Sequence, residues 1–67
     1  MTIQLNGKAH SLDEQTSSVS DLLASLGLAG KPVVVELDKV ALFPRQYAES
    51  QLVEGSCVEV ISIAAGG

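Results

Sequence analysis

The residues whose chemistry stands out first are the last two, Gly66 and Gly67, where an apolar stretch loses its side chains. Glycine has no Cβ, so these residues can pass through a narrow channel that excludes larger residues. Fully extended, residues 64–67 span roughly 13 Å, enough to carry a carboxylate to the bottom of a deep pocket. We expect the Gly67 carboxylate to react, and Ala64, Ala65 and Gly66 to form the tail that a partner binds. A linker remnant or a frayed end has the same composition. The choice between these interpretations and a functional tail therefore depends on the residues that precede it.

The composition predicts one small folded domain and excludes several functions. A chain of 67 residues, 46% of them hydrophobic, is near the lower size limit for a self-sufficient core. A formal net charge of -4 and an aromatic content of 3% disfavour nucleic-acid binding and favour a basic partner surface. No signal peptide or membrane-spanning run is present, and a single cysteine cannot form an internal disulfide. We expect a cytoplasmic protein without nucleic-acid or membrane partners, with residues 1–63 as its domain and residues 64–67 as a flexible tail.

The first residues predict a β-hairpin. Thr2–Leu5 alternates polar and apolar side chains, and residues 8–12 alternate more weakly. The Asn6-Gly7 pair between them is the strongest short signal for a type I′ turn, because both central residues of that turn need positive φ. Three apolar side chains of the hairpin are expected to point inward: Ile3, Leu5 and Leu12.

A short helix is predicted next. Ser18 and Asp21 have the spacing of a capping box, with Asp in place of the usual Glu or Gln. Gly27 occupies the position of a left-handed residue that ends a helix, and Leu28 the position of the hydrophobic residue that follows it. Between these ends, one apolar stripe at helical spacing is expected to pack on a sheet: Val19, Leu22, Leu23 and Leu26.

The second half predicts three more strands. Val33–Leu37 is β-branched and apolar, and a turn at residues 38–39 leads to a short strand over residues 40–43. Pro44 cannot donate to a sheet ladder, so it is expected to end that strand at a sheet edge and to begin one or two helical turns. Residues 57–63 form the last predicted strand.

This last strand is apolar on both faces. Val58 and Val60 share one face, while Ile61 and Ile63 share the other. Such a strand is either covered twice or meets a partner with its second face. Because only one helix is predicted, we expect Ile61 and Ile63 to contact a partner.

Other residues with reactive side chains favour structural interpretations. Cys57 lies within a predicted strand without adjacent positive charge, so a packed or half-packed thiol is expected rather than a sulfur relay. His10, the single histidine, is expected at the surface and cannot build a histidine-based metal site. Arg45 either contacts an acidic partner or braces its own loop. Four acidic residues are expected to form one solvated face that could steer docking: Glu36, Glu49, Glu54 and Glu59.

The order of these elements resembles the ubiquitin-like β-grasp fold, an α+β architecture with a mixed four- to five-stranded sheet packed on one helix. Within that fold, the chain looks most like the ThiS family of small sulfur carriers in thiamine thiazole synthesis, which implies the same function for this chain. Four places carry this resemblance: Leu5-Asn6-Gly7, Ser18-Val19 with Leu22-Leu23, Phe43-Pro44-Arg45 with Tyr47, and Gly66-Gly67.

The resemblance implies that other proteins act on the tail. A carboxylate is a poor electrophile, so a ThiF-type adenylyltransferase would use ATP to convert the Gly67 carboxylate to an acyl-adenylate. A persulfide from a sulfur donor, a cysteine desulfurase or an equivalent, would displace the adenylate, and cleavage of the sulfur–sulfur bond would leave a thiocarboxylate. A ThiG-type thiazole synthase would receive this sulfur. The chain would bind no cofactor or metal and would be a cosubstrate rather than an enzyme, with Ile61, Ile63 and Arg45 contacting its partners.

Two alternatives share the fold and the tail. The small subunit of molybdopterin synthase carries sulfur for another pathway, but it is usually longer and has an aromatic and proline-rich run before its glycines, which residues 61–65 lack. A ubiquitin-like modifier or passive interaction module would join its tail to lysines or leave it unused.

Overall fold

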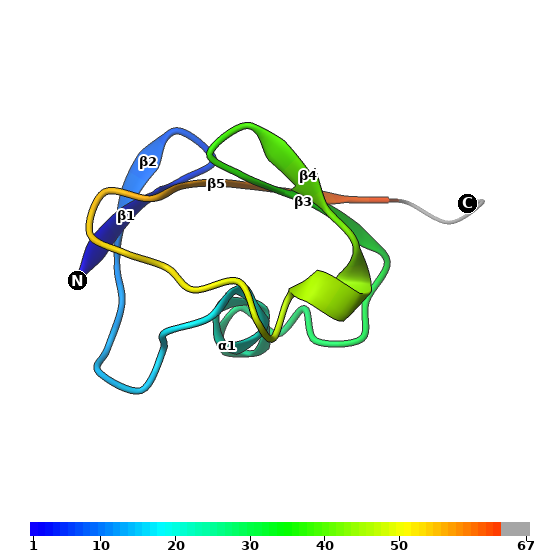
Figure 1. Ribbon diagram of the computed structural model, residues 1–67, viewed down its shortest axis with the longest axis horizontal. Coiled ribbons are helices and arrows are strands. Elements are labelled where there is room, and N and C mark those ends of the chain that lie inside the picture. The colour runs from blue at the N-terminus through cyan, green and yellow to red at the C-terminus, as the bar shows by residue number, and fades with distance from the viewer. Residues whose placement is uncertain (64–67) are drawn as a thin grey trace.

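The structure, a computed structural model, describes residues 1–63, so the predicted tail over residues 64–67 lies outside the described residues. Along residues 1–63, a first hairpin is followed by one α-helix, a second hairpin, one short 3₁₀ helix (η1) and a last strand (Figure 1). Their bounds are β1 Thr2–Leu5, β2 Lys8–Ser11, α1 Val19–Ser25, β3 Val33–Leu37, β4 Val40–Leu42, η1 Pro44–Gln46 and β5 Cys57–Ser62.

The five strands form one mixed sheet in the order β2-β1-β5-β3-β4. The last strand, β5, lies at the centre of the sheet, parallel to β1 and antiparallel to β3. Both α1 and η1 lie on one side of the sheet, below it in Figure 1. The predicted α+β class and the position of β4 at a sheet edge are therefore confirmed.

Both hairpins turn through two residues with positive φ. In the first turn φ is 51° at Asn6 and 82° at Gly7, as the Asn-Gly pair predicts. In the second turn Asp38 and Lys39 have φ of 49° and 71°, an uncommon conformation for residues with a side chain. Each turn joins two antiparallel strands. The first strand of each hairpin, β1 or β3, pairs with one edge of β5.

The predicted capping box begins α1. The Asp21 amide donates to Ser18 Oγ (3.0 Å), and the Ser18 amide donates back to Asp21 Oδ2 (3.2 Å). The Ser17 amide also donates to Asp21 Oδ2 (3.1 Å). These amides, that of Ser17 first, hold the pKa of the Asp21 carboxyl below its ordinary value of 3.8, because they stabilise the carboxylate.

A Schellman motif ends α1 after two turns. Gly27 has φ of 74°, and its amide donates to the Ala24 carbonyl (3.1 Å) while the Leu28 amide donates to the Leu23 carbonyl (2.8 Å). The predicted end of the helix is confirmed, and the chain can turn at once toward β3.

The core lies between α1 and the helix-facing side of the sheet. Each fully buried aliphatic side chain contributes about 1.5–3 kcal/mol relative to an exposed one. Leu52 is the member that the sequence pattern does not predict. It is held in place because the Leu52 amide donates to the Ser17 carbonyl (2.8 Å) beside the start of α1. The buried apolar side chains are Ile3, Leu12, Val19, Leu22, Leu23, Val35, Leu52 and Val58.

Candidate functional site

The sheet holds β5 up to the last described residue. On one side of β5, its pairing with β3 runs to Val33 opposite Ser62. The Ile63 amide then donates to the Pro32 carbonyl (3.0 Å). The chain is thus fixed to the body of the protein up to Ile63. The predicted site residues that follow lie outside the described residues: Ala64, Ala65, Gly66 and Gly67.

The two faces of β5 differ as the sequence pattern predicts. Val58 is buried and Val60 half-buried against the core, whereas Ile61 and Ile63 are 54% and 50% exposed. Their side chains belong to the face of the sheet opposite α1, which we call the open face. This exposure is what a partner contact requires, but whether a partner binds there stays a prediction.

Two further apolar side chains extend this surface. Val34 lies directly across from Ile61 in the sheet and is exposed. Phe43 is 61% exposed and follows β4 in an extended conformation, so its side chain alternates with that of half-buried Leu42 and lies on the side of Val34. We call Val34, Phe43, Ile61 and Ile63 the open-face patch.

Two members of the open-face patch, Val34 and Phe43, are not predicted as partner contacts from the sequence. A signal for Val34 existed, because the run Val33-Val34-Val35 has no polar residue where one face should be solvated. Phe43 is predicted as the last residue of a short strand and carries part of the family resemblance, but neither observation predicts the face on which its side chain lies. Its role in the patch depends on the β3–β4 register, which the sequence alone does not specify.

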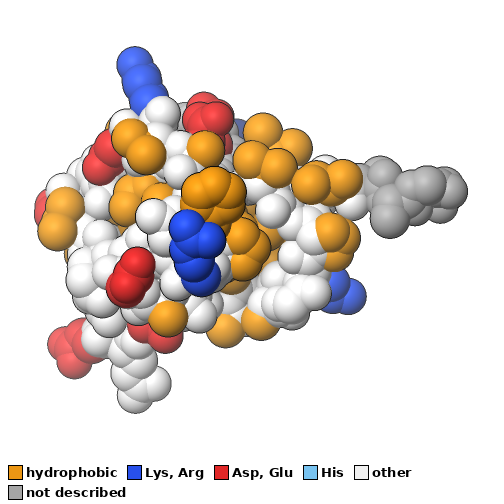
Figure 2. Space-filling model, turned by 45° about the vertical axis from the view of Figure 1, so that its right-hand side comes forward, with side chains coloured by type: hydrophobic (Ala, Val, Ile, Leu, Met, Phe, Trp, Pro, Cys, Tyr) orange, Lys and Arg blue, Asp and Glu red, His pale blue; other side chains and the backbone are white. Residues whose placement is uncertain are grey.

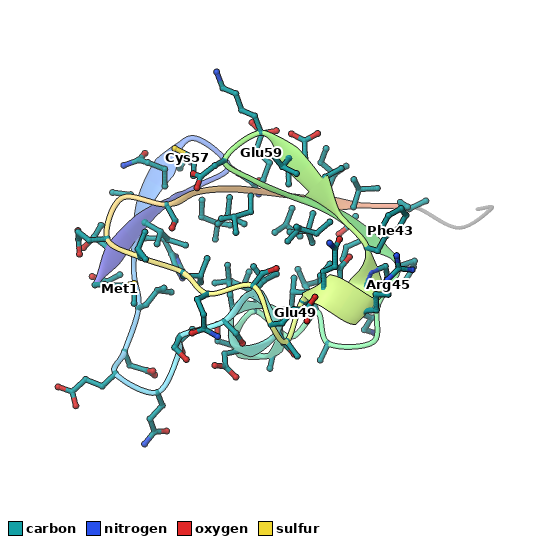
Figure 3. All side chains as sticks on the ribbon, viewed as in Figure 1. Met1, Phe43, Arg45, Glu49, Cys57 and Glu59 are labelled. Atoms are coloured by element: carbon teal, nitrogen blue, oxygen red, sulfur yellow. The ribbon has the colours of Figure 1, made fainter. Side chains whose placement is uncertain are left out.

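Arg45 contacts a residue of its own loop. Its guanidinium carbon lies 4.9 Å from the centre of the Phe43 ring, and the two side chains lie together near the end of β5 (Figure 3). Exposed cation–π contacts of this kind contribute about 0.5–1 kcal/mol. This contact fits the loop-bracing interpretation of Arg45 and holds a positive charge against the open-face patch. A contact between Arg45 and a partner stays a prediction.

The acidic residues do not form the single face that the sequence analysis predicts. Glu36 and Glu59 lie opposite each other on the open face. Glu54, by contrast, accepts a hydrogen bond from the Thr2 amide at the far end of the sheet (3.0 Å), and Glu49 lies on the side of α1 (Figure 3). The prediction is wrong because the four residues come from three separate segments whose directions depend on the tertiary fold.

Figure 2 shows a group of hydrophobic side chains toward the right of the view, while other hydrophobic side chains lie among the acidic ones on the left. Glu36 and Glu59 belong to the same face of the sheet as Val34 and Ile61, so carboxylates border the open-face patch.

Cys57 is exposed, so the predicted packed or half-packed thiol is wrong. As the first residue of β5 it shares the open face with Glu59, and it lies at the opposite end of the strand from the open-face patch (Figure 3). With strand geometry, Cys57 and Ile63 are roughly 20 Å apart. The thiol is therefore remote from the place where the chain leaves the sheet.

The described residues offer no other centre for chemistry. His10 is half-buried in β2, and among residues 1–63 no group of three His, Cys, Asp or Glu side chains is placed to hold a metal ion. No helix within the same residues has the length and apolar character needed to cross a membrane. The surface around the end of β5 is thus the candidate site.

One helix packed on a mixed five-stranded sheet, with a central last strand parallel to the first, is the ubiquitin-like β-grasp architecture. Comparisons with known proteins agree. The ThiS family model matches residues 3–67. The sulfur carrier protein ThiS of Bacillus subtilis (strain 168) is 35% identical over 65 residues, which are 97% of this chain and 98% of that protein.

Solved structures give the same result. The crystal structure of the thiamine biosynthesis protein ThiS from Geobacter metallireducens has a TM-score of 0.82 and 30% identity, with 100% of both chains covered. A solution structure of a thiamine biosynthesis protein from the same organism has a TM-score of 0.81 and 30% identity, covering 100% of this chain and 88% of that one.

The chain belongs to the ThiS family. Its function is sulfur carriage in thiamine biosynthesis, in which it is a protein cosubstrate and not an enzyme. The predicted family, fold and function are confirmed, and thiamine biosynthesis is favoured over the molybdopterin and modifier alternatives.

Proposed function

We propose that the Gly67 carboxylate is the group that carries sulfur. The carboxylate attacks the α-phosphate of ATP on a ThiF-type adenylyltransferase, which releases pyrophosphate and forms an acyl-adenylate. A persulfide sulfur then displaces AMP to give an acyl disulfide. A second thiol cleaves the sulfur–sulfur bond, so the persulfide carrier leaves as a disulfide and Gly67 keeps one sulfur as a thiocarboxylate.

The observation that supports this proposal most directly is the extent of the family match. It runs from residue 3 through Gly67, so the diglycine belongs to the part of the chain that the family shares. The folded body complements it, because central strand β5 is held on its β3 side up to Ile63 by the Pro32 carbonyl. A rigid strand followed by Ala64, Ala65 and Gly66 suits delivery of a terminus into a narrow site.

The open-face patch is the surface that we assign to the partners. Ile61 and Ile63 present apolar area next to the point where the tail begins, and Arg45 adds a positive charge held by Phe43. Apolar and aromatic side chains of this kind anchor protein interfaces. The partners are a ThiF-type adenylyltransferase and a ThiG-type thiazole synthase, with a cysteine desulfurase or an equivalent as the sulfur donor. ATP and persulfide sulfur are used on these proteins, in the cytoplasm, and the chain itself holds neither.

Mass spectrometry of the intact protein tests the proposal. The purified chain is incubated with the adenylyltransferase of its own organism, ATP and a persulfide donor, and ATP is omitted in the control. We expect an ATP-dependent mass gain that equals replacement of one oxygen by sulfur, located on Gly67 by fragmentation. An unchanged mass, or isopeptide conjugates to lysine, would contradict sulfur carriage on Gly67.

A further inference from the structure

Strand β5 continues beyond the end of its parallel neighbour β1. The two strands pair only at Gln4 with Cys57 and at Leu5 with Val58. The last backbone hydrogen bond between them runs from the Asn6 amide to the Val58 carbonyl (2.9 Å). The chain then turns at Asn6-Gly7, so the backbone of β1 cannot pair with the second half of β5.

The Asn6 side chain takes the place of the missing peptide unit. Its Oδ1 accepts a hydrogen bond from the Val60 amide (2.8 Å), and its Nδ2 donates to the Val60 carbonyl (3.3 Å). A turn residue with φ of 51° could be Asn, Asp or Gly. Only Asn supplies both a donor and an acceptor to one residue of the opposite strand, because its side chain ends in an amide.

We propose that Asn6 is a positioning residue for sulfur carriage. Val60 lies three residues before Ile63, which the Pro32 carbonyl holds from the other side of β5. Together these contacts hold β5 on both edges shortly before residue 64. Without the side-chain amide of Asn6, the second half of β5 is bonded to β3 alone. The direction in which the tail leaves the body for a partner is then less well defined. This inference rests on the proposed function of Gly67.

The second hairpin provides a matched control. Asp38 also has positive φ and also bonds β5 through its side chain, because the Cys57 amide donates to Asp38 Oδ1 (2.9 Å). Cys57 lies at the start of β5, the end remote from the tail. Asn6→Gly and Asp38→Gly therefore make the same kind of change in the second half and at the start of one strand, and glycine preserves positive φ in both turns.

The test is the steady-state kinetics of adenylation by the organism's adenylyltransferase, at a temperature where all variants are folded by circular dichroism. We expect Asn6→Gly to lower kcat/KM about tenfold, mainly through a higher KM, because ordering the tail then costs binding energy. Asp38→Gly should stay within about twofold of the wild type, since its contact lies far from the tail. Asn6→Asp keeps the acceptor but not the donor, so it should fall between them.

Hydrogen exchange of the Val60 amide provides a readout that does not depend on activity. Asn6→Gly should speed this exchange by on the order of tenfold, and Asp38→Gly should not. Equal kinetics of Asn6→Gly and Asp38→Gly, or unchanged exchange at Val60, would overturn the role of Asn6. If the wild-type protein itself is not adenylated, the proposed function of Gly67 fails, and with it the inference, which distinguishes that result from a failure at Asn6 alone.

Discussion

Turn residues in this protein form the hairpins and also bond the neighbouring strand. Asn6 and Asp38 both have positive φ, and both direct a side-chain oxygen to an amide of β5. Lys39 has the same strained backbone, with φ of 71°, and it is exposed. A left-handed conformation costs a residue with a side chain about 1–2 kcal/mol, so this strain is a property of a single residue.

Replacing Lys39 by glycine should stabilise the protein. Lys39→Gly removes the left-handed strain, and the greater freedom of glycine in the unfolded chain offsets part of the gain. We expect a net gain of about 0.5–1 kcal/mol and a rise in Tm of roughly 2–8 °C. Thermal unfolding measures this. Lys8→Gly, within β2, is the control and should lower Tm, and a lower Tm for Lys39→Gly would contradict the strain argument.

The terminal glycine can be tested by adding one methyl group. Gly67→Ala places a Cβ on the residue that we propose enters a narrow partner channel, so adenylation should be abolished or slowed at least about 100-fold. Tm should not change. Adenylation is measured by pyrophosphate release, with Ala65→Gly as the control that removes a methyl group instead. Normal turnover of Gly67→Ala would count against insertion of the tail.

Helix α1 is short, and it depends on the hydrogen bonds that cap its two ends. Seven residues are too few for a helix to persist alone, so its caps and its packing on the sheet must hold it. The carboxylate of Asp21 makes the stability of this helix cap depend on pH. Because its pKa is lowered in the folded state, the folded protein binds this proton less readily than the unfolded chain does.

The stability that Asp21 provides should be lost in acid. It is fully present above the ordinary pKa of 3.8 and disappears as the pH falls through the lower value of the folded state. Urea unfolding between pH 2 and pH 6 should therefore show a weaker pH dependence for Asp21→Asn than for the wild type. Glu14→Gln removes the same charge from an exposed position outside the cap and is the control. An unchanged pH profile for Asp21→Asn would refute the capping role.

At the scale of the whole molecule, the elements within residues 1–63 cover the sheet on one face only. The core lies between the sheet and α1, while the open face keeps the exposed open-face patch beside the point where the chain leaves β5. In our proposal, stability and partner recognition therefore depend on opposite faces of the same strand. Changes on the open face should affect binding far more than folding.

Ile61→Asp tests this separation. Its side chain is 54% exposed, so the expected loss of stability is about 1 kcal/mol or less. A carboxylate in the centre of an apolar interface should weaken binding to the adenylyltransferase at least about tenfold. Val53→Asp, at a loop residue that is 61% exposed and outside the patch, is the matched control. Calorimetry measures both quantities, and unfolding as the main effect of Ile61→Asp would show that the face assignment is wrong.

Much of this protein is determined by the sequence alone, because the decisive interactions are local. The Asn6-Gly7 turn, the box of Ser18 with Asp21 and the end of the helix at Gly27 depend on residues within a few positions of one another. Alternation in β5 likewise places Ile61 and Ile63 on the face opposite Val58 without reference to other segments.

Only the tertiary structure decided how distant segments meet. The Asn6 side chain binds Val60, 54 positions away, and Leu52 enters the core beside the start of α1. The exposure of Cys57 and the separation of the four glutamates also depended on which strands became neighbours. The physical reason is that strand order and register are set by burial of the whole core, and no short window of the chain contains that information.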